Sequence, residues 1–557
     1  MFQGKGKNAG KALNEHTKEE LIQMVCHLKE CKKFGLVWED KPEQVAKDCQ
    51  EKLPILREDK TKALTLDNEQ PTNIIIEGDN YHALSVLNYT HAGKIDVIYI
   101  DPPYNTGKKD EWKYNDRWVD ENDAYRHSKW LSFMEKRLKL AKGLLSENGV
   151  VFISIDDKEH ARLKVLCDEI FDENKFHGTL TWIKRTKPTN MGGAKYSLQS
   201  NVEYVLVYGH KSQDRHNYLL PKLEQKTYPN QDECGNFYRV ESVDQRKNIG
   251  SMIRPSMVYS VLGVAPKENY RWQMSPKERD ELLERNRLFV KNGKLYKRVY
   301  KEDEETAESL EPFWSHRQDT GTAEAAKEDL EKLLGRDEAF TTVKPVELLR
   351  QILLFSSSTN STVLDFFAGS GTTGQAVLEL NKADGGRRQF ILCTNNENQI
   401  AEDVTYPRIK TVITGTRPDG TKYSDGIPSN VRYFKTDFVS KNKTSDRLRR
   451  EIAPLCTDMI KIRENCFESV IDTEQLKVLR NNRGLVALVF DDGDLGNYIC
   501  QIDAIPTDAP VYLYVFSYNS DNRHYEIPDD ASHEYISQPI PEGVLSVYRR
   551  IFQPKDK

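Results

Sequence analysis

The sequence lacks the features that would place it in a membrane or in a disulfide-stabilised secreted class. No apolar run approaches the roughly 20 residues that a membrane-spanning helix needs, and the Gly/Lys-rich start has no apolar core of a signal peptide. The nine cysteines are scattered and odd in number, without a C-x-x-C pair, and no H-E-x-x-H motif occurs. We therefore expect reduced thiols in a cytoplasmic protein and no metal site.

A strongly basic charge is also missing. Lys and Arg number 81 against 86 Asp and Glu, which gives a formal net charge of −5. Any contact with nucleic acid would therefore have to come from local basic surface. The chain of 557 residues, 38% of them hydrophobic, is long enough to form several globular domains.

The most informative stretch runs from Ile95 to Asn105. It begins as a nearly continuous apolar run, which predicts a buried strand of an α/β sheet. It ends at Asp101-Pro102-Pro103-Tyr104, where two prolines forbid both helix and ladder pairing. Open α/β sheets bind their ligands at the carboxyl ends of strands. An acid, two rigid residues and an aromatic at such a place predict a site for a flat ring that carries an amine.

These four residues suit the activation of an exocyclic amine, whose lone pair is delocalised into its ring. Asp101 and the Pro102 carbonyl can accept hydrogen bonds from the two N–H groups and localise that lone pair. Tyr104 can stack on the ring, while Pro103 keeps the turn rigid. Taken alone, the stretch is also compatible with an ordinary strand that is followed by a solvated, proline-rich turn.

A second stretch, from Thr362 to Gly374, again runs from a short strand into a glycine-rich turn, with a helix predicted from Thr372. Glycines let the backbone approach a ligand closely, and the free N–H groups at a helix start favour an anionic group. A dinucleotide-binding loop is therefore one alternative, because three glycines satisfy the pattern G-x-G-x-x-G: Gly369, Gly371 and Gly374.

Two residues of this stretch argue against a dinucleotide. Asp365 and Phe367 put an acid and a bulky ring where a pyrophosphate would have to come close. An acid beside the glycines instead favours a ligand that carries an ammonium group, such as the amino-acid end of S-adenosylmethionine.

Together the two stretches resemble the amino-methyltransferases of DNA, with Asp-Pro-Pro-Tyr (101–104) as catalytic motif and Phe-Ala-Gly-Ser-Gly (367–371) as cofactor motif. The catalytic motif comes first, which is similar to the beta class, and its aspartate is similar to the adenine-N6 members. An amphipathic helix predicted from Thr17 to Phe34 and a small C-terminal α/β segment extend the resemblance to the modification (Mod) subunits of type III restriction-modification systems.

The resemblance implies a Rossmann-like, doubly wound and mostly parallel sheet. Strands predicted at 74–76, 95–100, 150–155 and 201–208 alternate with helical segments and favour the same α/β class. The expected organisation is an N-terminal helical segment, the catalytic half, a target-recognition insert, the cofactor half and a C-terminal α/β domain. Their bounds are 1–70, 71–210, 211–340, 341–433 and 434–557.

The resemblance also implies which residues bind S-adenosylmethionine. Those of the glycine-rich stretch are Asp365, Phe367, Ala368, Gly369, Ser370 and Gly371. Asp79 and Asn80 would lie near the adenine of the cofactor, although a βα turn with Asp79 as helix N-cap explains them equally. Lys344 would lie on the methionine side, while Asn396 and Glu397 follow a strand whose end commonly holds the ribose.

The predicted reaction is methyl transfer to the N6 of an adenine that is flipped out of double-stranded DNA. The insert mixes cations with aromatics, such as Arg271 and Trp272, which suits contacts with DNA. The resemblance implies a homodimer. No nucleotide-triphosphatase loop is found in the chain, so restriction would need a separate subunit with helicase and nuclease functions. Alternatives are an orphan methyltransferase for adenine N6 or cytosine N4, a methyltransferase of RNA or protein amides, and a non-catalytic DNA-specificity subunit.

Overall fold

The computed structural model contains two compact units, which are described separately. The first unit comprises Met1–Asn217 and Glu311–Lys557, and the second comprises Tyr218–Leu310. The structure describes Thr17, Trp38, Phe340 and residues 41–67, 70–107, 112–114, 117–185, 200–211, 219–221, 227–247, 253–300, 307–309, 313–314, 320–337, 342–441, 445–481, 483–491, 495–518 and 527–552. Apart from Thr17, the helix expected from Thr17 to Phe34 lies outside these residues.

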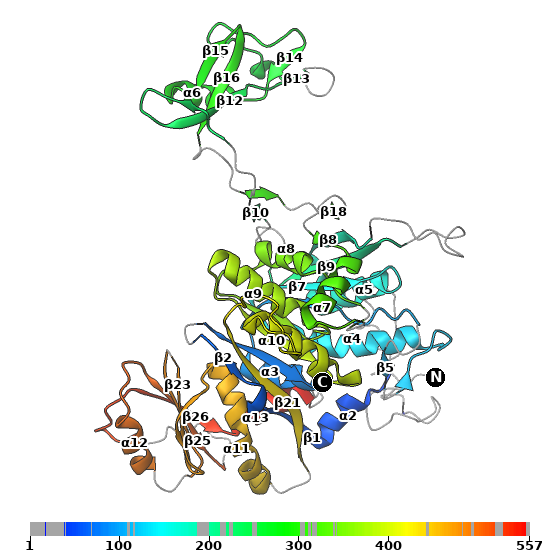
Figure 1. The fold of residues 1–557 in the computed structure, drawn as a ribbon, viewed down its shortest axis with the longest axis vertical. Helices are drawn as coiled ribbons and strands as arrows, with labels where there is room; N and C mark the ends of the chain where they lie inside the picture. Colours follow the sequence, from blue (N-terminus) through cyan, green and yellow to red (C-terminus); the bar gives the residue numbers. More distant parts are fainter. Residues whose placement is uncertain are drawn as a thin grey trace. The chain divides into compact units, whose positions relative to one another are not determined.

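The first unit is organised around an 11-stranded sheet (Figure 1). At its centre the strand order is β21-β3-β20-β19-β4-β7, and each neighbouring pair is parallel. These strands are β3 (Thr72–Glu77), β4 (Ile95–Ile100), β7 (Leu145–Ile155), β19 (Thr362–Asp365), β20 (Gln389–Thr394) and β21 (Asn430–Ser440). The prediction of a mostly parallel α/β sheet is confirmed.

Antiparallel strands flank this centre on both sides. β9 (Val202–Gly209) pairs with β7, and β8 (Phe176–Ile183) pairs with β9. At the other end, β1 (Lys52–Glu58) and β2 (Leu64–Thr65) pair with β21. β1 falls in the segment 1–70 for which the sequence pattern predicts helix, and it joins the sheet because its apolar residues 53–56 are buried there.

Helices cover both faces of the sheet (Figure 1). On one face α4 packs between α3 and α5, and on the other α9 and α10 pack with α8 and α7. The two faces are evident in β7, where Val151 belongs to the core under α4 while the adjacent Phe152 contacts Phe355 of α8. The helices are α3 (Asn80–Thr90), α4 (Arg126–Lys142), α5 (His160–Phe171), α7 (Ala323–Leu334), α8 (Val346–Ser356), α9 (Thr372–Asp384) and α10 (Tyr406–Thr414).

Asp96 is the one residue of β4 that is not buried, and it joins three strands. Its Oδ2 accepts a hydrogen bond from the backbone N–H of Thr362 at 2.9 Å, at the start of β19. Its Oδ1 accepts one from Ser146 Oγ at 2.9 Å, at the start of β7. These two hydrogen bonds hold the amino ends of β4, β7 and β19 in register. The carboxyl ends of the parallel strands β4 and β19 therefore lie at the same edge of the sheet.

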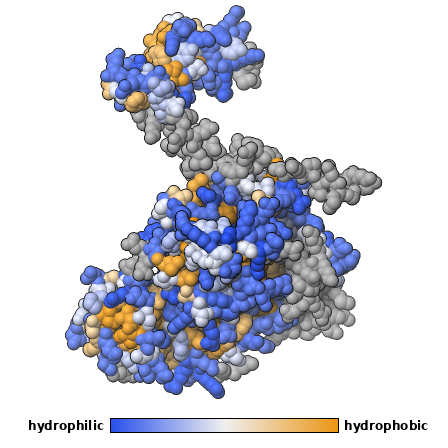
Figure 2. Space-filling model, viewed as in Figure 1, coloured by the Kyte–Doolittle hydropathy of each residue, from blue (hydrophilic) through white to orange (hydrophobic). Residues whose placement is uncertain are grey.

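The C-terminal part of the first unit adds a five-stranded sheet in the order β22-β23-β24-β25-β26. The helices α11 and α13 pack against α3 and thereby join this part to the main core. Figure 2 shows apolar side chains gathered over this sheet, where Val470 and Ile536 are exposed. The elements are α11 (Ser445–Glu464), β22 (Glu468–Asp472), β23 (Leu476–Asn481), β24 (Gly484–Val489), α12 (Leu495–Asp503), β25 (Val511–Phe516), β26 (Tyr535–Ile540) and α13 (Glu542–Phe552).

The second unit, Tyr218–Leu310, falls within the insert expected at 211–340, whereas α7 of that insert belongs to the first unit. It contains a four-stranded antiparallel sheet in the order β11-β12-β16-β15. A small core of Val261, Trp272, Met274, Leu288 and Leu295 lies against it. The elements are β11 (Asn230–Gln231), β12 (Phe237–Ser242), β13 (Gln245–Lys247), β14 (Tyr270–Trp272), α6 (Pro276–Glu284), β15 (Leu288–Lys291) and β16 (Lys294–Tyr300). The strands β10 (Leu219–Pro221) and β17 (Ala307–Ser309) pair with each other.

The remaining described elements are short, and no helix among the described residues is long and apolar enough to cross a membrane. They include α2 (Gln44–Glu51), β5 (Lys113–Tyr114), β6 (Arg117–Trp118) and a π-helical turn at Ile400–Thr405. Another, β18 (Phe313–Trp314), pairs in parallel with β8 at the edge of the main sheet.

Gly374 of α9 has a steric role rather than a conformational one. A Cβ at this position would lie 2.7 Å from Ile409 Cδ1 and 3.0 Å from Leu392 Cδ1. We expect Gly374→Ala to lower the free energy of unfolding by about 1–3 kcal/mol, since the fully buried side chains of Ile409 and Leu392 must move to admit the Cβ. Gly496→Ala is the control, because a Cβ added to that exposed helical glycine would meet nothing within 4 Å. Urea unfolding would contradict this account if the two variants lost equal stability.

Candidate active site and cofactor loop

The two sequence motifs meet at one edge of the central sheet. β4 and β19 are parallel neighbours, with Val97 opposite Val363 and Ile98 opposite Leu364. From β4 the chain proceeds to β7 on one side, and from β19 it proceeds to β20 on the other. Such a switch point is where open α/β sheets bind ligands. Asp101 follows β4 directly and Asp365 ends β19, so both carboxylates lie at this point.

The Asp-Pro-Pro-Tyr turn is held by hydrogen bonds to both its ends. Lys344 Nζ donates to Asp101 Oδ1 at 2.9 Å and to Oδ2 at 2.8 Å, and the Tyr104 hydroxyl donates to Asp101 Oδ1 at 2.7 Å. Trp130 Nε1 donates to the Pro103 carbonyl at 2.7 Å from α4. The turn is therefore rigid in its side chains as well as in its proline rings.

Lys344 also contacts a second buried acid, which the sequence pattern did not predict. Its Nζ lies 3.1 Å from Glu203 Oε2 on β9, and Lys184 Nζ lies 3.2 Å from Glu203 Oε1. We call Asp101, Lys344, Glu203 and Lys184 the ion-pair chain. Its formal charges cancel. The sequence signal for Glu203 is an acid inside the otherwise apolar strand Val202–Gly209.

Burial and charge act in opposite directions in the ion-pair chain. Burial by itself lowers the pKa of Lys344, but the carboxylates of Asp101 and Glu203 raise it above its ordinary value. Burial raises the pKa of Glu203, yet Lys344 and Lys184 bring it below the usual range. Both groups are therefore charged at neutral pH. The structure places the Lys344 ammonium on the acid of the Asp-Pro-Pro-Tyr motif, whereas the resemblance implies a cofactor contact for it.

Asn105 extends this support beyond the turn. It is buried with a positive φ of 57°. Its Nδ2 donates to Glu159 Oε1 at 2.6 Å, and Trp112 Nε1 donates to its Oδ1 at 3.2 Å. His127 Nδ1 contacts the same oxygen of Glu159. The chain therefore leaves the motif in a fixed direction.

The glycine-rich loop is built around Asp365. One carboxylate oxygen accepts from the Phe367 backbone N–H at 3.0 Å, and the other accepts from the Thr373 hydroxyl. Burial raises the pKa of Asp365 to about 7, and the nearby charge of Asp101 contributes to the rise. Asp365 therefore shapes the loop, and it is electrostatically coupled to the catalytic motif.

Arg408 of α10 supports the loop through hydrogen bonds, and the sequence pattern did not predict this role. It is 2% exposed and donates to Ser370 Oγ at 2.9 Å and to Thr372 Oγ1 at 2.8 Å. Burial lowers its pKa to about 10. Gly369 and Gly371 have φ of 48° and 81°, in the left-handed region that favours glycine. The loop is thus fixed by backbone geometry and by one buried guanidinium.

Asp79 and Asn80 follow β3 and connect this loop to α3 and α4. Asp79 caps α3, since its carboxylate accepts from the Tyr81 N–H at 2.7 Å, and Asn80 Nδ2 donates to the Phe366 carbonyl at 2.9 Å. Both contact Arg137, a fully buried residue of α4 that also pairs with Glu43 at 2.8 Å. The structure therefore holds Asp79 and Asn80 beside the glycine-rich loop.

Asn396 and Glu397 lie in the turn that follows β20. Asn396 Oδ1 accepts from the Glu402 N–H at 3.3 Å, and its Nδ2 donates to the Glu402 carboxylate at 3.3 Å. Lys62 and Lys435 pair with that carboxylate, and their hydrogen bonds lower the pKa of Glu402 to about 2. Glu397 begins the short 3₁₀ helix Glu397–Gln399. A ribose contact for these two residues stays a prediction.

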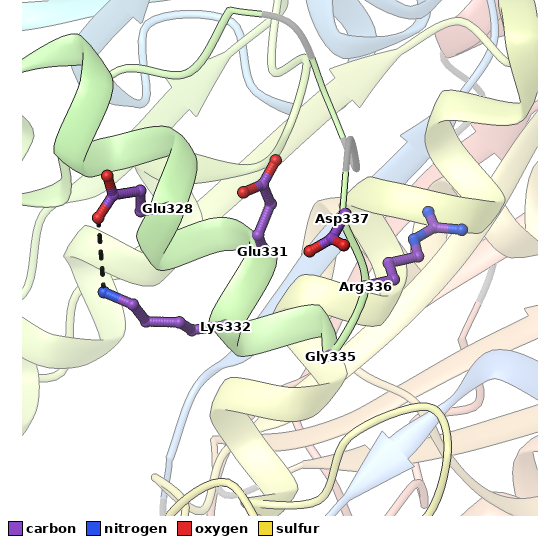
Figure 3. A pocket seen from close by; sticks show the side chains of 6 residues that line it. All are labelled: Glu328, Glu331, Lys332, Gly335, Arg336 and Asp337. Atoms are coloured by element: carbon purple, nitrogen blue, oxygen red, sulfur yellow. Dashed lines mark ion pairs between the residues drawn. The ribbon is translucent and has the colours of Figure 1, made fainter.

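Two hollows lie in the described part of the first unit. One, of about 260 Å³, borders the site and is lined by Lys344, Gln375 and Arg408 together with Ala326, Asp329, Val346, Glu347, Glu379 and Tyr423. The other, of about 320 Å³, lies at the end of α7 and shares no residue with the site (Figure 3). Within the described residues, no group of three His, Cys, Asp or Glu side chains could hold a metal ion.

Comparison with known proteins identifies the family. The family model for DNA methylases matches residues 95–404. The Mod subunit of the type III restriction-modification enzyme StyLTI of Salmonella typhimurium is 33% identical over 412 residues, which cover 68% of this chain and 60% of that protein. The type II methyltransferase M.KpnI of Klebsiella pneumoniae is 32% identical over 405 residues, which cover 68% of this chain and 91% of that protein. This chain belongs to the DNA methylase family, as predicted.

Two further comparisons describe the extent of the likeness. The matched region spans 60% of the length of the Mod subunits of StyLTI and of EcoPI from Escherichia phage P1. The crystal structure of a DNA modification methylase from Thermus thermophilus, complexed with S-adenosyl-L-methionine, shares 15% identity with a TM-score of 0.30, and the match covers 61% of this chain and 96% of that one.

Arg137 offers a test of how the loop and α3 are held together. We expect Arg137→Met to lower the free energy of unfolding by about 3–5 kcal/mol, because it leaves Glu43 buried without a counter-charge. Arg185→Met is the matched control, since Arg185 and its partner Glu324, 3.2 Å apart, are both about half-exposed; it should cost no more than about 1 kcal/mol. Equal losses in urea unfolding would contradict the role of Arg137.

Proposed function

We propose that this protein is a site-specific DNA methyltransferase that transfers the methyl group of S-adenosylmethionine to adenine N6 in double-stranded DNA. One observation carries the proposal. In a chain of the DNA methylase family, the carboxylate of Asp101 and the loop that follows Asp365 lie at the carboxyl ends of adjacent parallel strands. An acceptor for an amine and a cofactor loop are thereby neighbours.

The residues at this edge fit S-adenosylmethionine, which carries a sulfonium and an ammonium group. Three carboxylates lie near this edge, since Asp101 raises the pKa of Asp365, and Asp79 and Asp365 both raise the pKa of the Cys393 thiol. Lys344 pairs with Asp101 and Arg137 pairs with Asp79, so these surroundings carry little excess positive charge that would repel such a ligand. The left-handed glycines, Gly369 and Gly371, allow a ligand to approach the backbone. Bound here, the cofactor supplies an electrophilic methyl group.

The protein's own groups prepare the amine. Asp101 and the Pro102 carbonyl accept the two N6 hydrogens of a flipped adenine, which localises the nitrogen lone pair. Lys344 donates to both oxygens of Asp101 and so fixes the plane of its carboxylate. Tyr104 is held by its hydroxyl on Asp101 and stacks on the base. Asp101 then takes the proton that the methylated nitrogen loses.

The relatives suggest the partners. The match to type III Mod subunits supports a role as the modification subunit of a restriction-modification system. We propose that it acts on double-stranded DNA as a homodimer, with a separate restriction subunit. M.KpnI is matched over 91% of its length and is named a type II methyltransferase, which supports a stand-alone methyltransferase as the second candidate. In both cases the insert would provide target recognition.

The first experiment is mass spectrometry of nucleosides from a methylation-free host that expresses this chain. We expect N6-methyladenine from the wild type. Asp101→Ala should lower methyl transfer by at least about 100-fold, since it removes a preorganised acceptor, while leaving S-adenosylmethionine affinity nearly unchanged. N4-methylcytosine would overturn the choice of base. Simultaneous loss of transfer and of cofactor binding in Asp101→Ala would contradict the separate roles of the two motifs.

We expect Glu203 to influence the affinity for S-adenosylmethionine through its charge. Glu203→Gln leaves a net charge of +1 in the ion-pair chain, so affinity for the cationic S-adenosylmethionine should fall by about 10-fold. Affinity for S-adenosylhomocysteine, whose sulfur is neutral, should change little. Adding Lys184→Met removes the excess positive charge and should restore the ratio of the two affinities.

Calorimetric titration with both ligands distinguishes this effect from misfolding. A damaged pocket would weaken both ligands to the same extent, and the second substitution would not restore either. That result would leave Glu203 with a packing role only.

A further inference from the structure

The antiparallel sheet of the second unit has one face that the core does not use. Strand pairing places four aromatic and two arginine side chains on this side of β12, β16 and β15. We call this set the aromatic–arginine face: Tyr238, Arg287, Phe289, Tyr296, Arg298 and Tyr300.

The face is ordered in rows across the strands. Tyr238 pairs with Tyr300, their ring centroids 5.6 Å apart, and Phe289 pairs with Tyr296 in a stacked arrangement at 5.8 Å. Arg298 stands between these rows, 5.4 Å from the Tyr238 ring and 5.6 Å from the Phe289 ring. The Arg298 guanidinium therefore lies between rings from both neighbouring strands.

Arg287 completes the central row. Its carbonyl accepts from the Arg298 N–H at 2.8 Å, and its guanidinium lies 3.8 Å from the centroid of the Tyr300 ring. The Tyr300 hydroxyl donates to Asp232 at 2.8 Å. Tyr300 is buried, whereas Tyr238, Phe289, Tyr296 and Arg298 are partly exposed. Tyr300 is thus anchored, whereas the other three rings and Arg298 keep part of their surface available to a ligand.

The opposite face of the same strands is satisfied internally. Leu288 and Leu295 face the core of the unit. Lys297 and Arg239 both pair with Glu241, which lies opposite Lys297 on β12. The alternation along β16 therefore separates a face that packs on the core and forms its own ion pairs from the aromatic–arginine face.

Charge complementarity points to a polyanion. The chain as a whole carries −5, yet the segment from Arg285 to Arg298 has no carboxylate. Besides Lys297, which faces the other way, it has five cations: Arg285, Arg287, Lys291, Lys294 and Arg298. Flat rings interleaved with arginine suit nucleic acid, since rings stack on bases and sugars while guanidinium groups bind phosphate. An acidic protein would use the cations but would leave the stacked rings without a role.

We propose that the aromatic–arginine face is a nucleic-acid contact surface, on which Arg298 binds phosphate and Tyr296 stacks on a base or sugar. That the nucleic acid is the DNA substrate rests on the proposed function. The face itself rests on the strand register and on the ring and guanidinium geometry of this unit.

The test is fluorescence anisotropy of the full chain with a labelled duplex of mixed sequence, over a range of salt concentrations. Arg298→Gln should weaken binding by about 10-fold and lower the salt slope by about one. Tyr296→Leu should weaken binding by about 10-fold while leaving the salt slope unchanged, because it removes stacking alone. Lys297→Gln is the matched control on the same strand and should have no such effect, since Lys297 faces the other way and pairs with Glu241.

Cofactor binding and thermal unfolding show whether each variant is folded. Equal weakening by Arg298→Gln and Lys297→Gln, or unchanged binding in Arg298→Gln and Tyr296→Leu, would overturn the proposed face. Protein that needs Arg298 to bind DNA but transfers no methyl group would retain the face and overturn the proposed function. If Arg298→Gln transfers methyl groups with the same KM for DNA as the wild type, the proposed function is retained and the proposed face is overturned.

Discussion

The site depends on one ammonium group that is shared between two carboxylates. Lys344 Nζ lies within 3.1 Å of both Asp101 and Glu203 and is 6% exposed. A buried charge is costly unless it is paired and hydrogen-bonded, so the three side chains determine one another's positions. They come from the end of β4, from β9 and from the segment before α8. The electrostatic requirement of one lysine therefore fixes how distant parts of the first unit meet.

In the cofactor loop, too, one buried cation fixes the positions of its partners, but here these partners are neutral. Arg408 binds hydroxyl and amide oxygens of Ser370, Thr372 and Gln375, and its lowered pKa reflects burial. Asn80 meets the loop from the other side through the Phe366 carbonyl. Because the loop is held from two sides before any ligand binds, little ordering is left for the ligand to impose.

The two units place their charges differently, which agrees with the roles proposed for them. At the sheet edge of the first unit, cations are matched by acids, and the ion-pair chain is neutral. On the aromatic–arginine face, cations stand among rings with no carboxylate in the segment from Arg285 to Arg298. Neutral surroundings suit a cationic cofactor and a reacting amine, whereas an uncompensated basic face suits a phosphate backbone.

The sequence by itself determined the two motifs, the parallel α/β class and the family, because each depends on local patterns. Apolar strands that end in Asp-Pro-Pro-Tyr and in a glycine-rich turn are visible without coordinates. It did not reveal Glu203, Arg137 or Arg408, or the role of β1, or the contact of Lys344 with Asp101. These were decided only by the tertiary structure, because a single Glu, Lys or Arg in a sequence carries no signal of its partner. Partners 243 residues apart, as Asp101 and Lys344 are, become neighbours only when strand order and register bring them together.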